Sequence, residues 1–206
     1  ELLATDGAIE TLATRLVPLG AGDDNPARYA ITGLARYVSR PGAEASRAKV
    51  EEDILEALEA STDPECKAFL LRQLQQCGSD ETVSEIGGLL QDEAIASYAI
   101  LTLDSIGTKK ATRALTKGLK KTSGLTQLQI LSVLANNGPN RNASKVVRKR
   151  LATKPGADEQ VHLLSILVRL EGKAAEDDVT SALKSDQPRV AQAAVGFAKE
   201  LGIATE

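Results

Sequence analysis

The stretch that decides the fold runs from Pro64 to Gly107 and reads PECKAFLLRQLQQCGSDETVSEIGGLLQDEAIASYAILTLDSIG. Apolar residues recur in it every three or four positions, which is the spacing of one face of an α-helix. Gly78 and Gly107 interrupt this spacing, and glycine is common just beyond the end of a helix. The stretch therefore predicts one complete helix pair joined by a tight turn, followed by the first helix of the next pair. We expect Asp80 to cap the second helix.

The same pattern recurs along the chain. From Gly78 the later glycines follow in steps of 29, 31, 34 and 30 residues, at Gly107, Gly138, Gly172 and Gly202. An all-helical recurrence of this length is typical of a solenoid, in which each helix pair buries its apolar face against a neighbour. The sequence predicts an all-α fold, a right-handed α-α superhelix without a sheet, forming a single domain over residues 1–206. The expected pairs are about 26–60, 64–91, 93–121, 124–153 and 157–184, with a leading helix over 6–16 and a last helix over 188–201.

The composition agrees with close helix packing. Aromatic residues make up only 2% of the 206 residues, and Met and Trp are absent, so Leu, Ile, Val and Ala must build the core. No apolar run approaches the roughly 18 residues that a membrane-spanning helix needs, so we expect no membrane span. The first residues, ELLATDGAIE, begin without Met and show no signal-peptide pattern. We therefore expect the chain to be a piece of a longer protein.

The repeated segments ETVSEIGGLLQDE and EDDVTSALKSDQP resemble bacterial HEAT-like repeats, an armadillo-like α-solenoid class, over about residues 64–206. The segment GDDNPARYAITGLARYVSRPGAEASR, followed by ECKAFLLRQLQQCG, is similar to exported HEAT-repeat proteins of Bacteroidetes-type bacteria. Some of those proteins carry a domain of the 3-keto-disaccharide hydrolase or glucanase-like class. The resemblance implies an extracytoplasmic location, in the periplasm or at the cell surface, and a neighbouring domain that acts on carbohydrate. It carries over no catalytic residue.

The sequence offers little material for catalysis. His162 is the single histidine and lies on a strongly apolar segment, where a structural role is the usual one. Cys66 and Cys77 are 11 residues apart on one predicted helix. This spacing separates them by roughly 16 Å, too far for a disulfide, so we expect two free, buried thiols. Phosphate-binding glycine loops and the common metal or nucleophile motifs are absent. We therefore expect no enzyme, no cofactor and no metal site.

One segment near the beginning of the chain, between residues 24 and 42, concentrates aromatic and basic residues. It holds two of the three tyrosines together with three arginines, a mixture that is enriched at binding surfaces. An alternative is that the tyrosines only cover the end of the helix stack while the arginines are solvated. The segment predicts a possible second surface made of Arg28, Tyr29, Arg36, Tyr37 and Arg40.

The charge distribution is the sharper signal. Between Thr108 and Ala157 stand twelve Lys and Arg residues and no Asp or Glu, although the whole chain has a net charge of −3. By helical spacing most of them avoid the apolar faces of 108–121 and 142–153, so we expect two solvent-facing basic rows. In a HEAT stack these rows would lie side by side on the concave face. The predicted partner-binding residues are Lys109, Lys110, Arg113, Lys117, Lys120, Lys145, Arg148 and Lys149.

We consider three functions for this arrangement. The favoured hypothesis is a non-catalytic protein-interaction or scaffolding module that binds an acidic partner on its concave face. That partner would be a protein, a neighbouring domain of the same longer chain, which the resemblance implies is carbohydrate-active, or an anionic polysaccharide. The alternative is a nucleic-acid-binding HEAT-like protein, which the absence of aromatic residues from the basic block disfavours. An enzyme is the least favoured, because no set of titratable side chains converges in the sequence.

Overall fold

The computed structural model describes residues 7–204, and every regular element in this range is a helix. The predicted all-α class is therefore confirmed for the described part of the chain. No described helix is long and apolar enough to cross a membrane, as we expected. The chain divides into two compact units, Glu1–Thr122 and Ser123–Glu206. The single superhelical domain and its handedness stay predictions.

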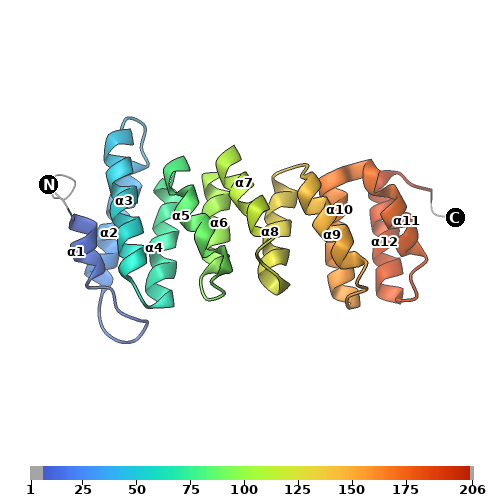
Figure 1. Ribbon diagram of the computed structural model, residues 1–206, viewed down its shortest axis with the longest axis horizontal. Coiled ribbons are helices and arrows are strands. Elements are labelled where there is room, and N and C mark those ends of the chain that lie inside the picture. Colours follow the sequence, from blue (N-terminus) through green and yellow to red (C-terminus); the bar gives the residue numbers. More distant parts are fainter. Residues whose placement is uncertain (1–6, 205–206) are drawn as a thin grey trace. The chain divides into compact units, whose positions relative to one another are not determined.

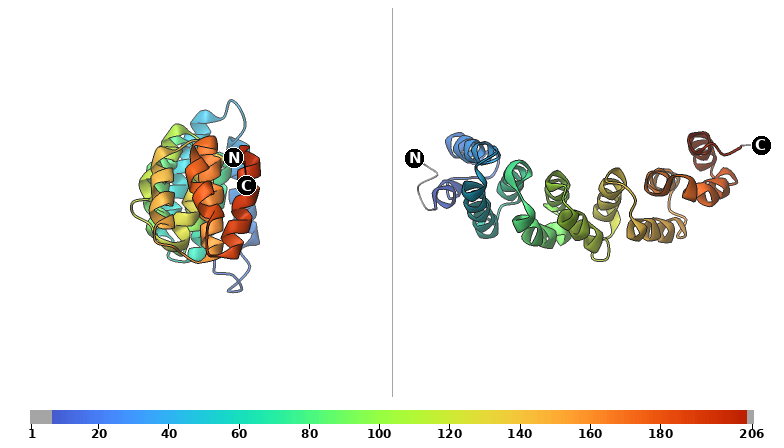
Figure 2. Two further views of the ribbon diagram at one scale, coloured as in Figure 1. Left: turned by 90° about the vertical axis from the view of Figure 1, so that its right-hand side faces the viewer. Right: turned by 90° about the horizontal axis from the view of Figure 1, so that it is seen from above.

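The first unit consists of two layers of helices (Figures 1 and 2). In one layer α4 lies between α2 and α6 and contacts both, while in the other α5 contacts α7. The helix α3 packs on α1, α2 and α4 and meets the turn before α5. The elements are α1 (Ala8–Ala13), α2 (Asn25–Val38), α3 (Glu44–Ala60), α4 (Pro64–Cys77), α5 (Val83–Gly88), α6 (Ala96–Ile106) and α7 (Lys109–Gly118), with 3-10 turns η2 (Asp80–Thr82) and η3 (Leu89–Gln91) on either side of α5.

The core of the first unit is aliphatic, as the composition predicts. Leu70, Leu71 and Leu74 of α4 are fully buried, and they lie at the spacing of one helix face. Ile86 of α5 is also fully buried. Burying a side chain of this size contributes about 1.5–3 kcal/mol before entropy is counted. Both predicted thiols, Cys66 and Cys77, are free and buried here, which confirms that expectation.

Two glycines fix the ends of helices in this unit for different reasons. Gly107 closes α6 with φ of 66°, in the left-handed region that glycine adopts without strain. Gly78 closes α4 in an extended conformation, and a Cβ atom there would lie 2.5 Å from the carbonyl oxygen of Leu74. Gly78 is therefore required by a close approach of the backbone.

The second unit is built around α10. This helix contacts α8, α9 and α12, and α11 packs on α12. Leu163, Ile166 and Leu167 of α10 are fully buried, so the nearly all-round apolar pattern of its sequence reflects neighbours on several sides. The elements are α8 (Gly124–Asn136), α9 (Arg141–Leu151), α10 (Ala157–Glu171), η4 (Gly172–Ala175), α11 (Glu176–Leu183) and α12 (Pro188–Leu201).

The predicted helix boundaries differ from the observed ones mainly in two places. The leading helix, expected over 6–16, is α1 and covers only Ala8–Ala13, while residue 6 lies outside the described part. The helix expected up to residue 91 is regular only from Val83 to Gly88 and continues as a 3-10 turn. Asp80 does not cap it, which is a correction. Instead, the Ser79 hydroxyl accepts a hydrogen bond from the amide of Glu81. The Asp80 carboxylate accepts a hydrogen bond from the Thr108 hydroxyl.

Candidate binding surfaces

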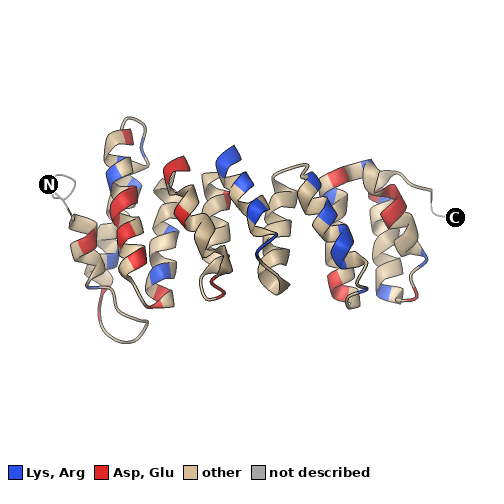
Figure 3. Ribbon diagram, viewed as in Figure 1, with Lys and Arg blue, Asp and Glu red and all other residues tan. Residues whose placement is uncertain are grey.

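The basic groove is a hollow of about 480 Å³ between α5 and α7 in the first unit. Four basic side chains line it from the α7 side, those of Lys110, Arg113, Lys117 and Lys121. The spacing of Lys110, Arg113 and Lys117 places these three on one side of α7, and Lys121 follows just after its end. Ala111 and Leu115 on another side are fully buried. Figure 3 shows basic residues along α7. Sequence patterning thus placed the apolar and basic faces of α7 correctly.

The opposite wall of the basic groove belongs to α5 and η3. Two glycines, Gly87 and Gly88, lie on it, together with Ser84 and Gln91. A Cβ atom added at Gly87 would contact Ala114 at 3.5 Å, whereas one at Gly88 would meet nothing within 4 Å. The Gly87 distance is an ordinary van der Waals contact, so packing requires neither glycine, and their lack of side chains leaves this wall of the hollow open.

The electrostatics of the basic groove are one-sided. No lining residue is acidic. Among the described residues, no carboxylate forms an ion pair with Arg113 or Lys117, and both side chains are exposed. Lys110 donates to the carbonyl oxygen of Asp80 at 2.6 Å, which fixes its position at the edge. The clustered cations give the groove a positive electrostatic potential, so the groove attracts anions.

The predicted residues of the first unit separate into two groups. Lys110, Arg113 and Lys117 line the basic groove, while Lys109 and Lys120 are exposed outside it. Lys121 also lines the groove but was not among the predicted contacts. Its spacing of four residues from Lys117 could have placed it on the same face of the helix expected over 108–121, although α7 itself ends at Gly118.

The predicted row in the second unit lies on α9. Lys145 and Lys149 are exposed, as expected. Arg148 is instead held by two carboxylates, Glu171 at 2.5 Å and Asp178 at 2.9 Å. Arg148 holds the pKa of Glu171 below its usual range through these hydrogen bonds. The partners lie 23 and 30 residues further along the chain, which is why the local sequence did not reveal them.

The predicted second surface lies on one side of α2 and just beyond its end. All five of its residues line a shallow hollow, and Tyr29 is 84% exposed. The Arg40 guanidinium lies 3.8 Å from the centre of the Tyr37 ring. Arg28 is not free for a partner, because it forms ion pairs with Asp24 at 2.8 Å and Glu65 at 2.7 Å. Arg28 thus holds the loop before α2 against α4.

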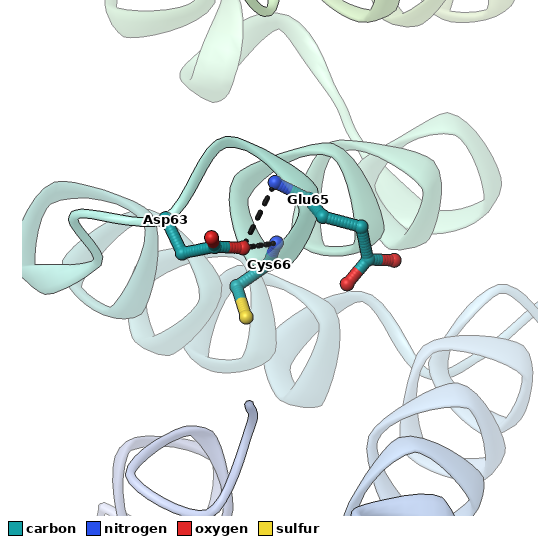
Figure 4. Close-up of side chains that lie close together, drawn as sticks. All are labelled: Asp63, Glu65 and Cys66. Carbon is teal, nitrogen blue, oxygen red and sulfur yellow. Dashed lines mark hydrogen bonds between the residues drawn. The ribbon is translucent and has the colours of Figure 1, made fainter. Parts of the chain in front are cut away.

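One cluster, Asp63, Glu65 and Cys66, brings possible metal-ligand atoms within 4.8 Å of one another (Figure 4). Its geometry is that of a helix cap. The Asp63 Oδ1 atom accepts from the amides of Glu65 at 3.0 Å and Cys66 at 2.9 Å, which are the first free amides of α4. The Glu65 carboxylate pairs with Arg28. Burial raises the pKa of the Cys66 thiol to about 11, so it stays protonated. These groups explain one another without an ion.

His162 is exposed on α10, and its Nε2 atom lies 3.0 Å from the Ser132 hydroxyl of α8. A nucleophilic serine needs a base that is itself oriented by a third group. Among the described residues, no carboxylate is hydrogen-bonded to this histidine. The pair ties α8 to α10, which agrees with the structural role expected for a lone histidine.

No family model and no curated protein matches the chain. Among solved structures, it is similar to the crystal structure of an engineered protein, a target of the Northeast Structural Genomics Consortium. The identity is 20%, the TM-score is 0.47, and the match covers 94% of this chain and 96% of that chain. A likeness at this level says nothing about function.

Proposed function

We propose that the protein is a non-catalytic interaction module that binds an acidic segment of a protein partner or of a neighbouring domain in the basic groove. The observation that carries this proposal is the charge of that groove, because four cations line it and none of the lining residues is acidic. Packing alone gains nothing from such an arrangement, since like charges repel. An anionic partner removes the repulsion.

The finer features of the proposal rest on the repeat pattern. They include the HEAT-like superhelix with a concave binding face and the extracytoplasmic location. Lys145 and Lys149 of α9 are proposed as further contacts of the second unit. Arg148 is left out of the proposed contact surface, because Glu171 and Asp178 already neutralise it. The α2 hollow, with its exposed Tyr29 and Tyr37, is the proposed second contact surface for the same partner.

The test is a fluorescence anisotropy titration of a labelled poly-glutamate peptide. Charge reversal of Arg113 and Lys117 to Glu should weaken binding by at least about tenfold at low salt. Wild-type binding should also weaken as the Debye length falls from about 10 Å at 0.1 M salt to about 3 Å at 1 M.

The matched control is the double variant with Lys109 and Lys120 changed to Glu. It alters the net charge by the same amount, at exposed positions near the same helix but outside the groove. Equal losses in both double variants would show that only net charge matters, which contradicts a defined groove. The nucleic-acid alternative is tested with a single-stranded oligonucleotide. Tighter binding of that probe than of poly-glutamate, lost in the Arg113 and Lys117 variant, would replace the proposal with that alternative.

A further inference from the structure

A second groove of opposite charge lies in the first unit, between α3 and α5. This acidic groove has a volume of about 760 Å³. Six glutamates line it, Glu51, Glu52, Glu56 and Glu59 from α3 with Glu81 and Glu85 from the α5 side, and Lys67 is the only basic lining residue. Figure 3 shows acidic residues along α3 and on α5.

The walls of the acidic groove are not uniformly polar. Leu55 and Leu58 of α3 and Leu89 of η3 also line it. Leu55 and Leu89 are partly exposed, so each presents apolar surface to the hollow. A ligand that fills this groove must therefore contact aliphatic side chains as well as carboxylates.

Glu51 distinguishes this groove from an ordinary solvated acidic face. Its side chain lines the groove but is only 2% exposed. The Oε2 atom accepts a hydrogen bond from the Ser79 hydroxyl at 2.7 Å, whereas the buried Oε1 atom has no hydrogen-bond partner. A buried carboxylate without a full set of partners costs stability. Burial accordingly raises the pKa of Glu51, and the nearby Glu81 adds to the rise while Arg47 opposes it.

The arrangement of the glutamates argues for an extended ligand over a single ion. Within the described residues, the three-membered cluster whose ligand atoms converge is Asp63, Glu65 and Cys66, none of which lines this groove. The glutamates are instead distributed over α3, η2 and α5. Distributed carboxylates around an aliphatic strip match a polypeptide with several cationic side chains and apolar ones between them.

We propose that the acidic groove is a docking site for a Lys/Arg-rich polypeptide segment with interspersed leucine-like residues. Its cationic side chains pair with the exposed glutamates and bring positive charge next to the buried Glu51 carboxylate, while its apolar side chains cover Leu55 and Leu89. The site is separate from the basic groove of the proposed function. The protein would then hold two partners of opposite charge on the two sides of α5.

The experiment uses two fluorescein-labelled peptides of equal length and charge, one of Lys and Leu and one of Lys and Ser. The Lys/Leu peptide should bind wild-type protein more tightly than the Lys/Ser peptide by at least about threefold. Changing Glu56 and Glu85 to Gln should weaken its binding by about tenfold. The control changes Glu93 and Glu200 to Gln, two exposed glutamates outside the groove, and should change binding by less than about twofold.

The Glu51→Gln variant separates a binding role from a purely structural one. The proposal expects weaker Lys/Leu binding, by about threefold, together with a higher melting temperature. A higher melting temperature with unchanged binding would mean that Glu51 does not face the ligand, which contradicts its assigned role. Equal binding of both peptides would overturn the apolar part of the site.

Two other occupants give distinct results. Sedimentation of the wild type would show salt-sensitive self-association, lost both in the Glu56 and Glu85 variant and in the Arg113 and Lys117 variant, if the occupant were a second copy. A melting temperature raised by Ca²⁺ or Mg²⁺ alone, dependent on Glu56 and Glu85, would identify a cation site if neither peptide binds. Either result overturns the proposal. A failure of poly-glutamate binding, by contrast, concerns only the basic groove.

Discussion

The acidic and basic grooves of the first unit share α5 as a wall but differ in charge and in the kinds of side chain that line them. The acidic groove contains a buried carboxylate and two partly exposed leucines, Leu55 and Leu89. The basic groove has Gly87 and Gly88 on its α5 wall and a row of exposed cations on α7. The two helices that face α5 across these grooves, α3 and α7, thus carry opposite charge.

This difference shows which residues the fold requires and which it leaves open. Ile86 of α5 is fully buried, and its replacement would affect the shared wall of both grooves. Glu56 and Lys117, by contrast, are exposed and their charges are not needed to bury any apolar surface. The charge of each groove is therefore a property that a partner can explain and packing cannot.

The largest effect should come from weakening the shared wall. Ile86→Ala removes a fully buried side chain from α5 and should lower the free energy of unfolding by about 2–5 kcal/mol. Ile86→Val is the matched control, with an expected cost of about 0.5–1.5 kcal/mol. Urea denaturation measures both. If the Ala variant lost no more stability than the Val variant, α5 would not be a packed wall.

A smaller effect of opposite sign is expected at the acidic groove. Glu51→Gln should raise the free energy of unfolding by about 1 kcal/mol at pH 7, because an unpaired buried carboxylate is removed. The folded pKa of Glu51 is raised by burial above the unfolded value of about 4.3. The native state therefore keeps the Glu51 proton to higher pH than the unfolded state does. The free energy of unfolding falls as pH rises from the unfolded pKa through the higher folded pKa.

Denaturation at several pH values checks this prediction. The advantage of the Gln variant should be complete at neutral pH and should disappear below the unfolded pKa, where wild-type Glu51 is protonated in both states. The groups around it are Ser79, Arg47, Glu81 and Cys77. An advantage that stayed constant down to pH 3 would have another cause.

Arg148 of α9 forms ion pairs with two carboxylates, whereas Arg113 of α7 forms none with the described residues. Arg148→Met should cost about 1 kcal/mol, because it leaves Glu171 and Asp178 without their partner. This figure allows for the 40% exposure of the Arg148 side chain, which lets water screen the pairs. Arg113→Met, the matched control on α7, should change stability by less than about 0.5 kcal/mol.

The pH dependence of the Arg148 variant has a defined sign. Arg148 lowers the pKa of Glu171, so the contribution of this pair is present above the unfolded pKa of about 4.3 and is lost as pH falls through the folded value. The difference in unfolding free energy between wild type and Arg148→Met should therefore shrink in acid. Equal costs for the Arg148 and Arg113 variants would mean that the two cations play the same role.

Much of the helical architecture could be predicted because it depends on local spacing. The pair 64–91 follows from apolar periodicity and from Gly78, and the exposed face of α7 follows from the positions of Ala111 and Leu115. The partners of Arg148 could not be found this way, since both lie on the following helix pair. The burial of Glu51 was not predicted, although Glu51 lies three residues before Ile54 and seven before Leu58, on the buried face of its helix. Its hydrogen bond with Ser79 depends on another segment and could not be found from its own helix.

The basic groove was predicted only in part. A row of cations follows from helical spacing, but a groove needs a second wall, and α5 is 26 residues earlier in the chain, counted from Val83 to Lys109. The sequence pattern indicates only that Gly87 and Gly88 belong to a helix. That they line a groove follows from the packing of α5 beside α7.

The most direct measurement is a titration of Gly88→Leu with both labelled peptides, poly-glutamate and Lys/Leu. Gly88 has a helical φ of −64° and open space beside it, so the substitution should fold and should fill only the basic groove, which it lines. All charges stay the same. The account predicts a loss of at least about tenfold for poly-glutamate and less than about twofold for the Lys/Leu peptide. Unchanged poly-glutamate binding, or an equal loss for both peptides, would contradict two separate grooves on the two sides of α5.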